Sequence, residues 1–178
     1  MGRGIGVVVV LCGVLGCGGG AAEGGGGGGA VPAAAGGACL PVAPMELVVL
    51  EHGSEWEPIA RLLPDGTVVN KHGPVGSIAQ DQFFDRAHAS VFWCAPDRTL
   101  HIRARPEAIA HFDAQDRLVD PKDPGGVWVD DAGGLHAIGP GGRDMFDGKA
   151  RFVGGYAGAR RTAVMVYFAA MSGARWGF

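Results

Sequence analysis

The chain has 178 residues, of which 33 are Gly and 47% are hydrophobic, and its formal net charge is −3 at pH 7. Acidic and basic residues are interspersed, so the charge gives no reason to expect a nucleic-acid partner. Glycine is concentrated near the N-terminus, and about 140 residues follow it, the size of one ordinary domain. We therefore expect a single domain, residues 38–178, behind a separate N-terminal region.

The first 17 residues have the layout of a secretory signal. Arg3 supplies an early positive charge, an apolar run extends from Ile5 to Leu15, and Gly16 and Cys17 follow. The apolar run covers 11 positions, whereas a membrane-spanning helix needs about 20. The run is too short to span a bilayer and predicts a signal peptide over residues 1–16.

Val14, Leu15, Gly16 and Cys17 resemble the lipobox of bacterial lipoproteins, in which an apolar residue, a second residue and Gly or Ala precede an invariant Cys. The resemblance implies cleavage after Gly16 and acyl chains such as palmitate on Cys17, so the lipid bilayer is the expected partner. Position 18 is Gly rather than Asp, which in lipoproteins favours the periplasmic face of the outer membrane. The inner membrane and the cell surface remain open, and the alternative is an ordinary secretory signal with an incidental Cys17.

Residues 18–37 predict a flexible tether. They contain 11 Gly and few side chains that a core could bury, so they cannot recover the entropy lost on ordering. A flexible chain of this length has an end-to-end distance of about 25 Å. The domain would then lie near a membrane without being pressed against it.

Two cysteines, Cys39 and Cys94, remain once the signal is removed and Cys17 is lipidated. An even pair in an oxidising compartment predicts a disulfide between the start of the domain and a central strand. Such a long closed loop would contribute about 4 kcal/mol to stability. Two reduced thiols are the alternative, because the sequence does not give the Cα separation, which must be under about 7 Å.

From residue 45 onward, short apolar runs alternate with turn residues, which is typical of β-strands. Single strands are expected at residues 46–51, 76–80, 117–119 and 151–154. Three hairpins are expected at residues 59–69, 90–103 and 127–138. In the first, Pro64 presets a turn angle, Asp65 suits the next position, and Gly66 takes the left-handed conformation that starts a bulge. The comparable positions of Pro64, Pro96 and Ala132 suggest a repeat of hairpins, with chance similarity as the alternative.

Helical patterns are scarce. Segments 81–87 and 106–112 each predict a turn or two of helix, the second with Pro106 at a tolerated first position. Thr162–Met171 is apolar throughout; its length leaves strand and helix open, and its β-branched and aromatic residues favour a central strand. We therefore expect a mainly β fold, an antiparallel meander of hairpins in a small sandwich or open barrel with one or two short helical turns. An α+β fold with a C-terminal helix is the alternative.

Motifs that carry chemistry are also scarce. The six His residues are separated by 10 to 25 positions, so none forms the close ligand pair typical of a metal site. His52, Ser54, Glu55 and Trp56 gather a base, a hydroxyl, an acid and an aromatic ring in an expected loop. They are weak binding candidates, either a sugar-binding or hydrolytic edge or a polar turn. No catalytic residue, metal ligand or cofactor is assigned.

Two further groups of side chains allow more than one interpretation. Carboxylates are concentrated in the 19 residues from 113 to 131, at Asp113, Asp116, Asp120, Asp123, Asp130 and Asp131. Oxygen ligands suit calcium, but the spacing does not match the EF-hand loop, so a solvated acidic loop is expected. Trp56, Trp93 and Trp128 either stack on glycans or fill the core and its rim.

The sequence favours a membrane-anchored envelope lipoprotein that acts as a non-catalytic binding or structural module. An envelope protein or a glycan is the expected further partner, and no nucleic acid is expected. The amino-acid sequence, rich in predicted strands and in Gly and Ala, is similar to that of lipoproteins of GC-rich bacteria. This resemblance implies no activity. The alternatives are a cell-wall-directed hydrolase with dispersed active-site residues and a metal- or ligand-binding lipoprotein.

Overall fold

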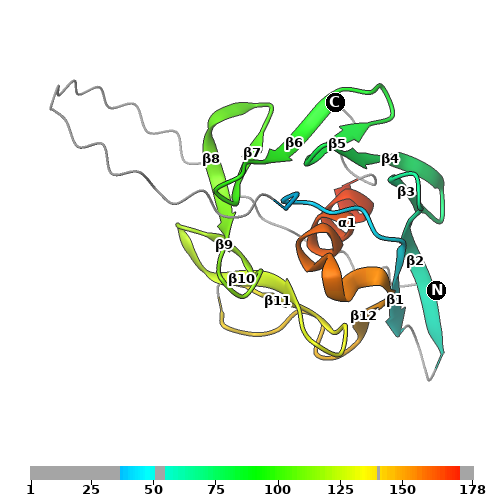
Figure 1. The fold of residues 1–178 in the computed structure, drawn as a ribbon. Helices are drawn as coiled ribbons and strands as arrows, with labels where there is room; N and C mark the ends of the chain where they lie inside the picture. The colour runs from blue at the N-terminus through cyan, green and yellow to red at the C-terminus, as the bar shows by residue number, and fades with distance from the viewer. Residues whose placement is uncertain (1–36, 51–54, 140, 173–178) are drawn as a thin grey trace, which may run out of the picture. The chain divides into compact units, whose positions relative to one another are not determined.

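Short antiparallel strands follow one another around a single C-terminal helix (Figure 1). The computed structural model describes residues 37–50, 55–139 and 141–172, and all of them belong to one compact unit. The strands within these residues are β1 (Met45–Leu50), β2 (Trp56–Leu62), β3 (Thr67–Asn70), β4 (Gly73–Ala79), β5 (Gln82–Asp85), β6 (Ser90–Cys94), β7 (Thr99–Ile102), β8 (Arg105–Phe112), β9 (Leu118–Asp120), β10 (Asp123–Val129), β11 (Leu135–Ile138) and β12 (Ala150–Gly154). A 3-10 helix η1 (Gly155–Gly158) leads into the α-helix α1 (Arg160–Ser172).

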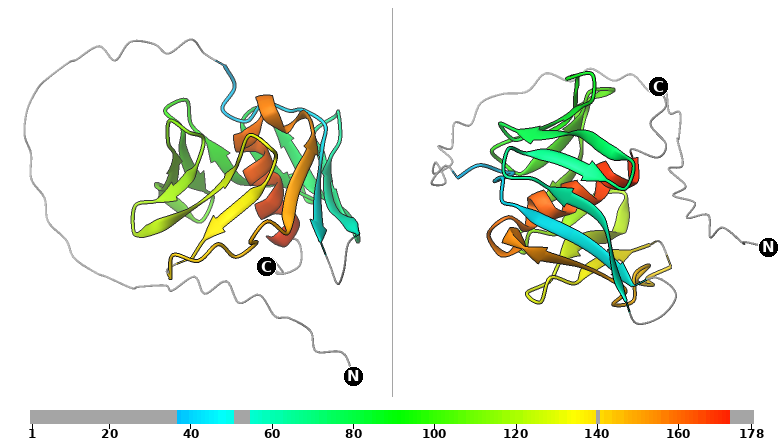
Figure 2. Two further views of the ribbon diagram at one scale, coloured as in Figure 1. Left: turned by 90° about the horizontal axis from the view of Figure 1, so that it is seen from below. Right: turned by 90° about the vertical axis from the view of Figure 1, so that its right-hand side faces the viewer.

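The sheet is a meander in which each strand from β1 to β11 pairs with the next. β12 returns to pair with the free side of β1. An isolated bridge between Gly134 and Arg151, and a hydrogen bond of 2.7 Å from the Phe152 N–H to the Gly133 carbonyl, bring the two ends of the sheet together. The described fold is therefore mainly β, as the sequence predicts, and its sheet is a nearly closed barrel around α1 (Figure 2).

The three predicted hairpins are confirmed as β2–β3, β6–β7 and β10–β11. In the first turn the Leu63 N–H donates to the Thr67 carbonyl and the Gly66 N–H donates to the Leu63 carbonyl. Gly66 has a φ of 85°, the left-handed conformation expected for it. The predicted strands at 46–51, 76–80, 117–119 and 151–154 correspond to β1, β4, β9 and β12, except that residue 51 lies outside the described residues.

The turn geometry recurs along the chain, although the prolines do not define it. The same pair of backbone hydrogen bonds closes the turns that begin at residues 63, 85, 95, 113, 130 and 139. In four of these turns a buried residue before the turn is matched by a second buried residue six positions further along the chain: Leu62 and Val68, Cys94 and Leu100, Phe112 and Leu118, Val129 and Leu135. The repeat is thus one of inward-facing pairs across hairpin turns.

Two predicted helical turns are wrong, since segment 81–87 contains strand β5 and segment 106–112 lies within strand β8. In β5, Phe83 is buried between two half-buried neighbours, and in β8 the exposed His111 separates buried Ala110 and Phe112. This alternation is the period of a strand. β5 starts after a tight turn in which Gln80 and Asp81 both have positive φ, 51° and 61°, the conformation that a two-residue hairpin needs.

Of the two structures that the sequence left open for Thr162–Met171, the favoured central strand is wrong and the alternative, a C-terminal helix, is confirmed, because these residues belong to α1. Every residue from Thr162 to Tyr167 is buried. A helix that is apolar on all sides is one enclosed by the protein, and α1 contacts β2, β3, β4 and β10. Enclosure by the curved sheet outweighs the strand preference of Val164 and Val166.

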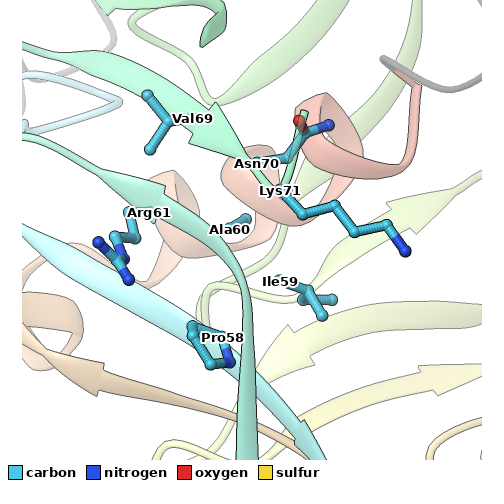
Figure 3. A pocket seen from close by; sticks show the side chains of 7 residues that line it. All are labelled: Pro58, Ile59, Ala60, Arg61, Val69, Asn70 and Lys71. Carbon is cyan, nitrogen blue, oxygen red and sulfur yellow. The ribbon is translucent and has the colours of Figure 1, made fainter. Parts of the chain in front are cut away.

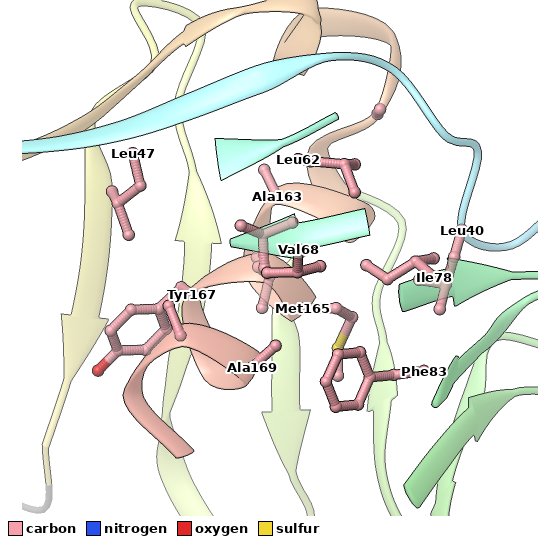
Figure 4. Packing of buried hydrophobic residues seen from close by; sticks show 14 of the residues in the cluster. Leu40, Leu47, Leu62, Val68, Ile78, Phe83, Ala163, Met165, Tyr167 and Ala169 are labelled. Carbon is pink, nitrogen blue, oxygen red and sulfur yellow. The ribbon is translucent and has the colours of Figure 1, made fainter. Parts of the chain in front are cut away.

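The core lies between α1 and the inner face of the sheet (Figure 4). Helix side chains such as Met165 and Tyr167 meet strand side chains such as Leu47 and Phe83. Each of these four side chains is at most 5% exposed. Burying them away from water stabilises this arrangement, at roughly 25 cal/mol for each Å² of apolar surface.

Residues 37–44 pass over the start of α1 before β1 begins (Figure 1). Leu40 is 2% exposed, and its N–H donates to Asp81 Oδ1 over 2.6 Å. Thr162 Oγ1 donates to the Pro41 carbonyl over 2.8 Å. Cys39 and Cys94 form a disulfide with their Cα atoms 6.0 Å apart. Residues 37–44, which we call the entry segment, are thus held to both the sheet and the helix.

Candidate functional site

A shallow groove of about 340 Å³ lies where the β8–β9 turn and the end of β10 meet the start of α1. We call it the Trp128 groove, and its lining residues are Gln115, Arg117, Trp128, Val129, Asp130, Asp131 and Arg160. The groove combines an aromatic ring, an amide, two guanidinium groups and two carboxylates. Binding sites commonly combine an apolar or aromatic surface with polar groups that fix the orientation of a ligand, and both are present here.

The strand alternation presents Trp128 on the outer face of the sheet. Its neighbour Val129 and the facing Leu135 are buried, so Trp128 and its cross-strand partner His136 point the other way. The indole and imidazole rings stack with centroids 4.9 Å apart and an angle of 15° between their planes. The imidazole therefore supports one face of the indole at the groove.

His136 is held between two carboxylates. Its Nδ1 lies 2.7 Å from Asp144 Oδ2, and its Nε2 lies 3.0 Å from Asp130 Oδ2. Partial burial by itself lowers the pKa of His136, but the hydrogen bonds and charges of Asp130 and Asp144 outweigh it and raise the pKa above 6.5. Since a carboxylate only accepts, both ring nitrogens donate in the imidazolium form. The two carboxylates thus favour the imidazolium form of His136, in which both ring nitrogens donate.

Asp130 and Asp144 are also fixed by the backbone. Asp130 Oδ1 accepts from the N–H groups of Ala132 and Gly134, which shape the β10–β11 turn. Asp144 Oδ1 accepts from the Phe146 N–H over 3.0 Å. Burial by itself raises the pKa of both carboxyls, but these hydrogen bonds and those from His136 outweigh burial, so each pKa lies below 3.8. Both carboxylates therefore have hydrogen-bond partners in the neighbouring backbone and in His136.

The His136 cluster, defined as Asp130, His136 and Asp144, is expected to make stability depend on pH. A raised folded-state pKa of His136 stabilises fully below pH 6.5, and the contribution is lost as pH rises through that folded pKa. The lowered carboxyl pKa values stabilise above pH 3.8 and lose their contribution as pH falls through the folded pKa values. The cluster therefore stabilises most between about pH 4 and 6.5.

The measurement is the free energy of unfolding in urea at pH 5.5 and pH 8. Wild type is expected to lose about 0.2–1 kcal/mol more than His136→Gln between these values, because half-exposed ion pairs are screened by water. His72→Gln, at an exposed turn position, is the matched control and should behave like wild type. A His136→Gln variant with the pH dependence of wild type would contradict this role of the cluster.

The guanidinium groups of the groove are paired as well. Arg117 Nε lies 2.7 Å from Asp113 Oδ2, and Arg160 is paired with Asp131. The Arg160 Nε is buried and has no hydrogen-bond partner within the part of the chain that the structure describes. Each cation at the groove thus has a nearby carboxylate, and the groove carries no large excess of either charge.

A second stacked pair repeats the first away from the groove. Trp93 in β6 faces His101 in β7, with ring centroids 5.2 Å apart and an angle of 6° between the planes. His101 Nε2 lies 3.1 Å from Thr99 Oγ1. Here the hydroxyl takes the place of one carboxylate, and Trp93 is not among the residues that line the Trp128 groove.

A smaller hollow of about 170 Å³ lies over β2 and β3 (Figure 3). Its lining residues are Pro58, Ile59, Ala60, Arg61, Val69, Asn70 and Lys71. Arg61 Nε is committed to Glu46 Oε1 at 2.7 Å. This hollow has no aromatic side chain and half the volume, so the Trp128 groove is the stronger candidate.

The candidate site residues of the predicted lipobox and at positions 52–56 either lie outside the described residues or do not line the Trp128 groove. Gly16, Cys17, His52 and Ser54 lie outside the described residues, as does the predicted tether before residue 37. Glu55 is exposed. Trp56 starts β2, with the Arg151 guanidinium 4.2 Å from its ring centroid. Neither Glu55 nor Trp56 lines the Trp128 groove.

Three of the six aspartates of the acidic segment, Asp113, Asp120 and Asp130, are turn-forming acceptors. The expected acidic loop over residues 113–131 is wrong, because the segment contains β9 and β10. Asp113 Oδ1 accepts from the N–H groups of Gln115 and Arg117, and Asp120 Oδ1 accepts from the N–H of Lys122. Among the described residues, no group of three His, Cys, Asp or Glu side chains is placed to hold a metal ion.

Sequence reasoning missed the roles of Gln115, Arg117, Arg160 and Asp144 at or beside the groove. One signal could have found the outer-face pairs. The spacing from Trp93 to His101 equals the spacing from Trp128 to His136, across a hairpin turn in both cases. Arg160 could not have been found this way, because only the folded sheet brings the start of α1 to the β8–β9 turn.

No helix in the described part of the chain combines the length and apolar character needed to cross a membrane. Comparisons with protein-family models, with curated proteins and with solved structures find no match to this chain.

Proposed function

We propose that the chain is a lipid-anchored protein of a cell envelope whose folded domain acts as a non-catalytic binding module. Acyl chains on Cys17 hold it at a membrane, the periplasmic face of an outer membrane being favoured. In this proposal residues 18–37 serve as the tether, and the domain binds an envelope partner through the Trp128 groove.

One observation favours binding over catalysis: both ring nitrogens of His136 are hydrogen-bonded to carboxylates. A general base needs a free lone pair and a pKa near the working pH. His136 has no free lone pair in this arrangement, because both ring nitrogens face carboxylates. Asp130, the carboxylate shared by the groove and the His136 cluster, accepts from two backbone N–H groups. These restraints favour a rigid recognition surface over acid–base chemistry.

Two features support the envelope location. The resemblance of Val14–Cys17 to a lipobox implies export and lipidation. The disulfide between Cys39 and Cys94 suits an oxidising compartment. The position of Cys39 is also consistent with an anchor on the N-terminal side, because the disulfide ties the entry segment to β6. A pull on the tether would then act on a covalent link to the sheet.

The anchor is tested by mass spectrometry of the protein made in a bacterial host. The mature N-terminus is expected to be Cys17 carrying acyl chains, and the protein should fractionate with membranes. Cys17→Ser is expected to remove the acyl mass and to release most of the protein from the membrane fraction, since a protein without acyl chains loses about 0.8 kcal/mol of membrane binding per methylene. Cys12→Ser, in the same signal segment, is the matched control and should be processed like wild type. A mature product that retains residues before Cys17, or has no acyl group there, would refute the anchor.

A further inference from the structure

We propose that the Trp128 groove binds a neutral saccharide, with a pyranose ring against the indole of Trp128 and its hydroxyls paired with the surrounding polar side chains. The proposal rests on the proposed function, a binding module, and names the class of its ligand. Three properties of the groove lead to it: balanced charge, an amphipathic lining and a small open volume.

Balanced charge disfavours a strongly ionic ligand. Arg117 is paired with Asp113 at 2.7 Å, and Arg160 is paired with Asp131. An anion would have to compete with these carboxylates, and a cation would have to compete with the guanidinium groups. A neutral ligand rich in hydroxyls meets no such competition. It can use the N–H donors that each guanidinium keeps after one pairing, together with the unused lone pairs of the carboxylates.

The lining is amphipathic in the way that a sugar requires. Trp128 lines the groove and is partly exposed, and one face of its indole is stacked on the imidazole of His136. The C–H groups on one face of a pyranose ring form an apolar patch that can pack on such a surface. Around it, the Gln115 amide both donates and accepts, Arg160 donates, and Asp131 accepts. Ring hydroxyls, which also donate and accept, match this set.

The two turns that border the groove, and the indole of Trp128, are held in place before any ligand arrives. The His136 cluster fixes the indole through the stacked ring, and Asp130 Oδ1 fixes the β10–β11 turn through two backbone N–H groups. Asp113 Oδ1 does the same for the turn that carries Gln115 and Arg117. A preformed site reduces the entropy lost on binding, which matters for a weak, flexible ligand such as a glycan.

The size of the groove sets the length of the ligand. Its volume of about 340 Å³ is at the low end of small-molecule sites, which span about 300–1,000 Å³. One or two pyranose rings suit this space, and the rest of a longer glycan can leave through the open side. The groove therefore fits an end or a short stretch of a polysaccharide.

The experiment measures binding of neutral disaccharides to the full chain by ligand-observed NMR and by Trp fluorescence. The probes are N,N′-diacetylchitobiose, cellobiose and maltose, with citrate as an anionic comparison. The protein is kept in a detergent without a sugar headgroup. At least one neutral disaccharide is expected to bind with a Kd of millimolar or tighter, and citrate is expected not to compete.

Variants locate the binding. Trp128→Ala is expected to weaken binding of the disaccharide at least 10-fold, because the stacking surface is lost. Trp93→Ala is the matched control, since it removes the other stacked indole outside the groove and should bind like wild type. Gln115→Ala changes an exposed turn side chain and should weaken binding several-fold without unfolding the domain, so it serves if Trp128→Ala does not fold.

Absence of binding by all three disaccharides would overturn the proposal, as would binding that Trp128→Ala and Gln115→Ala leave unchanged. Displacement by citrate would assign the groove to anions instead. Each of these results leaves the lipid anchor intact, because the anchor is judged by the mass of the N-terminal peptide. Hydrolysis of a bound disaccharide would instead overturn the non-catalytic part of the proposed function and leave the site assignment standing.

Discussion

Phe152→Ala is expected to lower the free energy of unfolding by about 3–5 kcal/mol, the cost of truncating a buried Phe. Phe152 is 1% exposed and is among the largest fully buried side chains. It lies in β12, the strand that returns to pair with β1 and brings the ends of the sheet together. Removing its ring would leave a cavity that the rigid barrel around α1 could close only in part.

Val153→Ala is the matched control for this substitution. Val153 is the next residue of β12, points to the opposite face and is 37% exposed, so its truncation should change stability by no more than about 0.5 kcal/mol. Urea unfolding followed by far-ultraviolet circular dichroism measures both variants. Equal effects of the two substitutions would mean that β12 does not alternate between core and solvent as described.

Loss of the Cys39–Cys94 disulfide is expected to lower the free energy of unfolding by about 4 kcal/mol. The two residues are 55 positions apart, and a cross-link over a loop of that length removes much of the entropy of the unfolded chain. The disulfide also holds the entry segment, in which Leu40 is buried and bonded to Asp81. The double variant Cys39→Ser with Cys94→Ser should therefore unfold at a markedly lower urea concentration than wild type.

A reductant gives the control for this prediction. It should shift the unfolding midpoint of wild type toward that of the double variant and leave the double variant unchanged. Free-thiol titration of the unfolded, unreduced protein should find neither Cys39 nor Cys94. A wild-type midpoint that does not respond to the reductant, with both thiols free, would show that the pair is reduced in solution.

Much of the sheet could be predicted because hairpin turns are local. Pro64, Asp65 and Gly66 define a turn through their own backbone angles and hydrogen bonds, and the flanking apolar residues then face each other. The secondary structure of segments 81–87 and 106–112 was harder to predict. A short run with two or three apolar residues fits the period of an α-helix and that of a β-strand equally well. In β5 the tight turn at Gln80 and Asp81 decides for a strand, although neither residue is Gly.

The disulfide pairing and the groove show where sequence reasoning ends. Counting cysteines left Cys39 and Cys94 as a pair, but only the fold supplies a Cα separation of 6.0 Å. Trp128 could be named as a candidate for glycan stacking from its type alone. Arg160 could not, because the curl of the sheet around α1 brings it to the groove, whereas Arg117 lies beside Trp128 through the pairing of β9 with β10.

The sequence by itself determined the strand-rich character of the domain and three of its hairpins, because these depend on residues within a few positions of one another. Tertiary structure decided that Thr162–Met171 lies in a helix, since only the surrounding sheet can bury every side of that apolar segment. It also decided that Trp128 lies beside the start of α1 in a groove. Closure of a curved sheet brings together residues that are far apart in the chain, and a pattern within a few residues of sequence cannot predict such contacts.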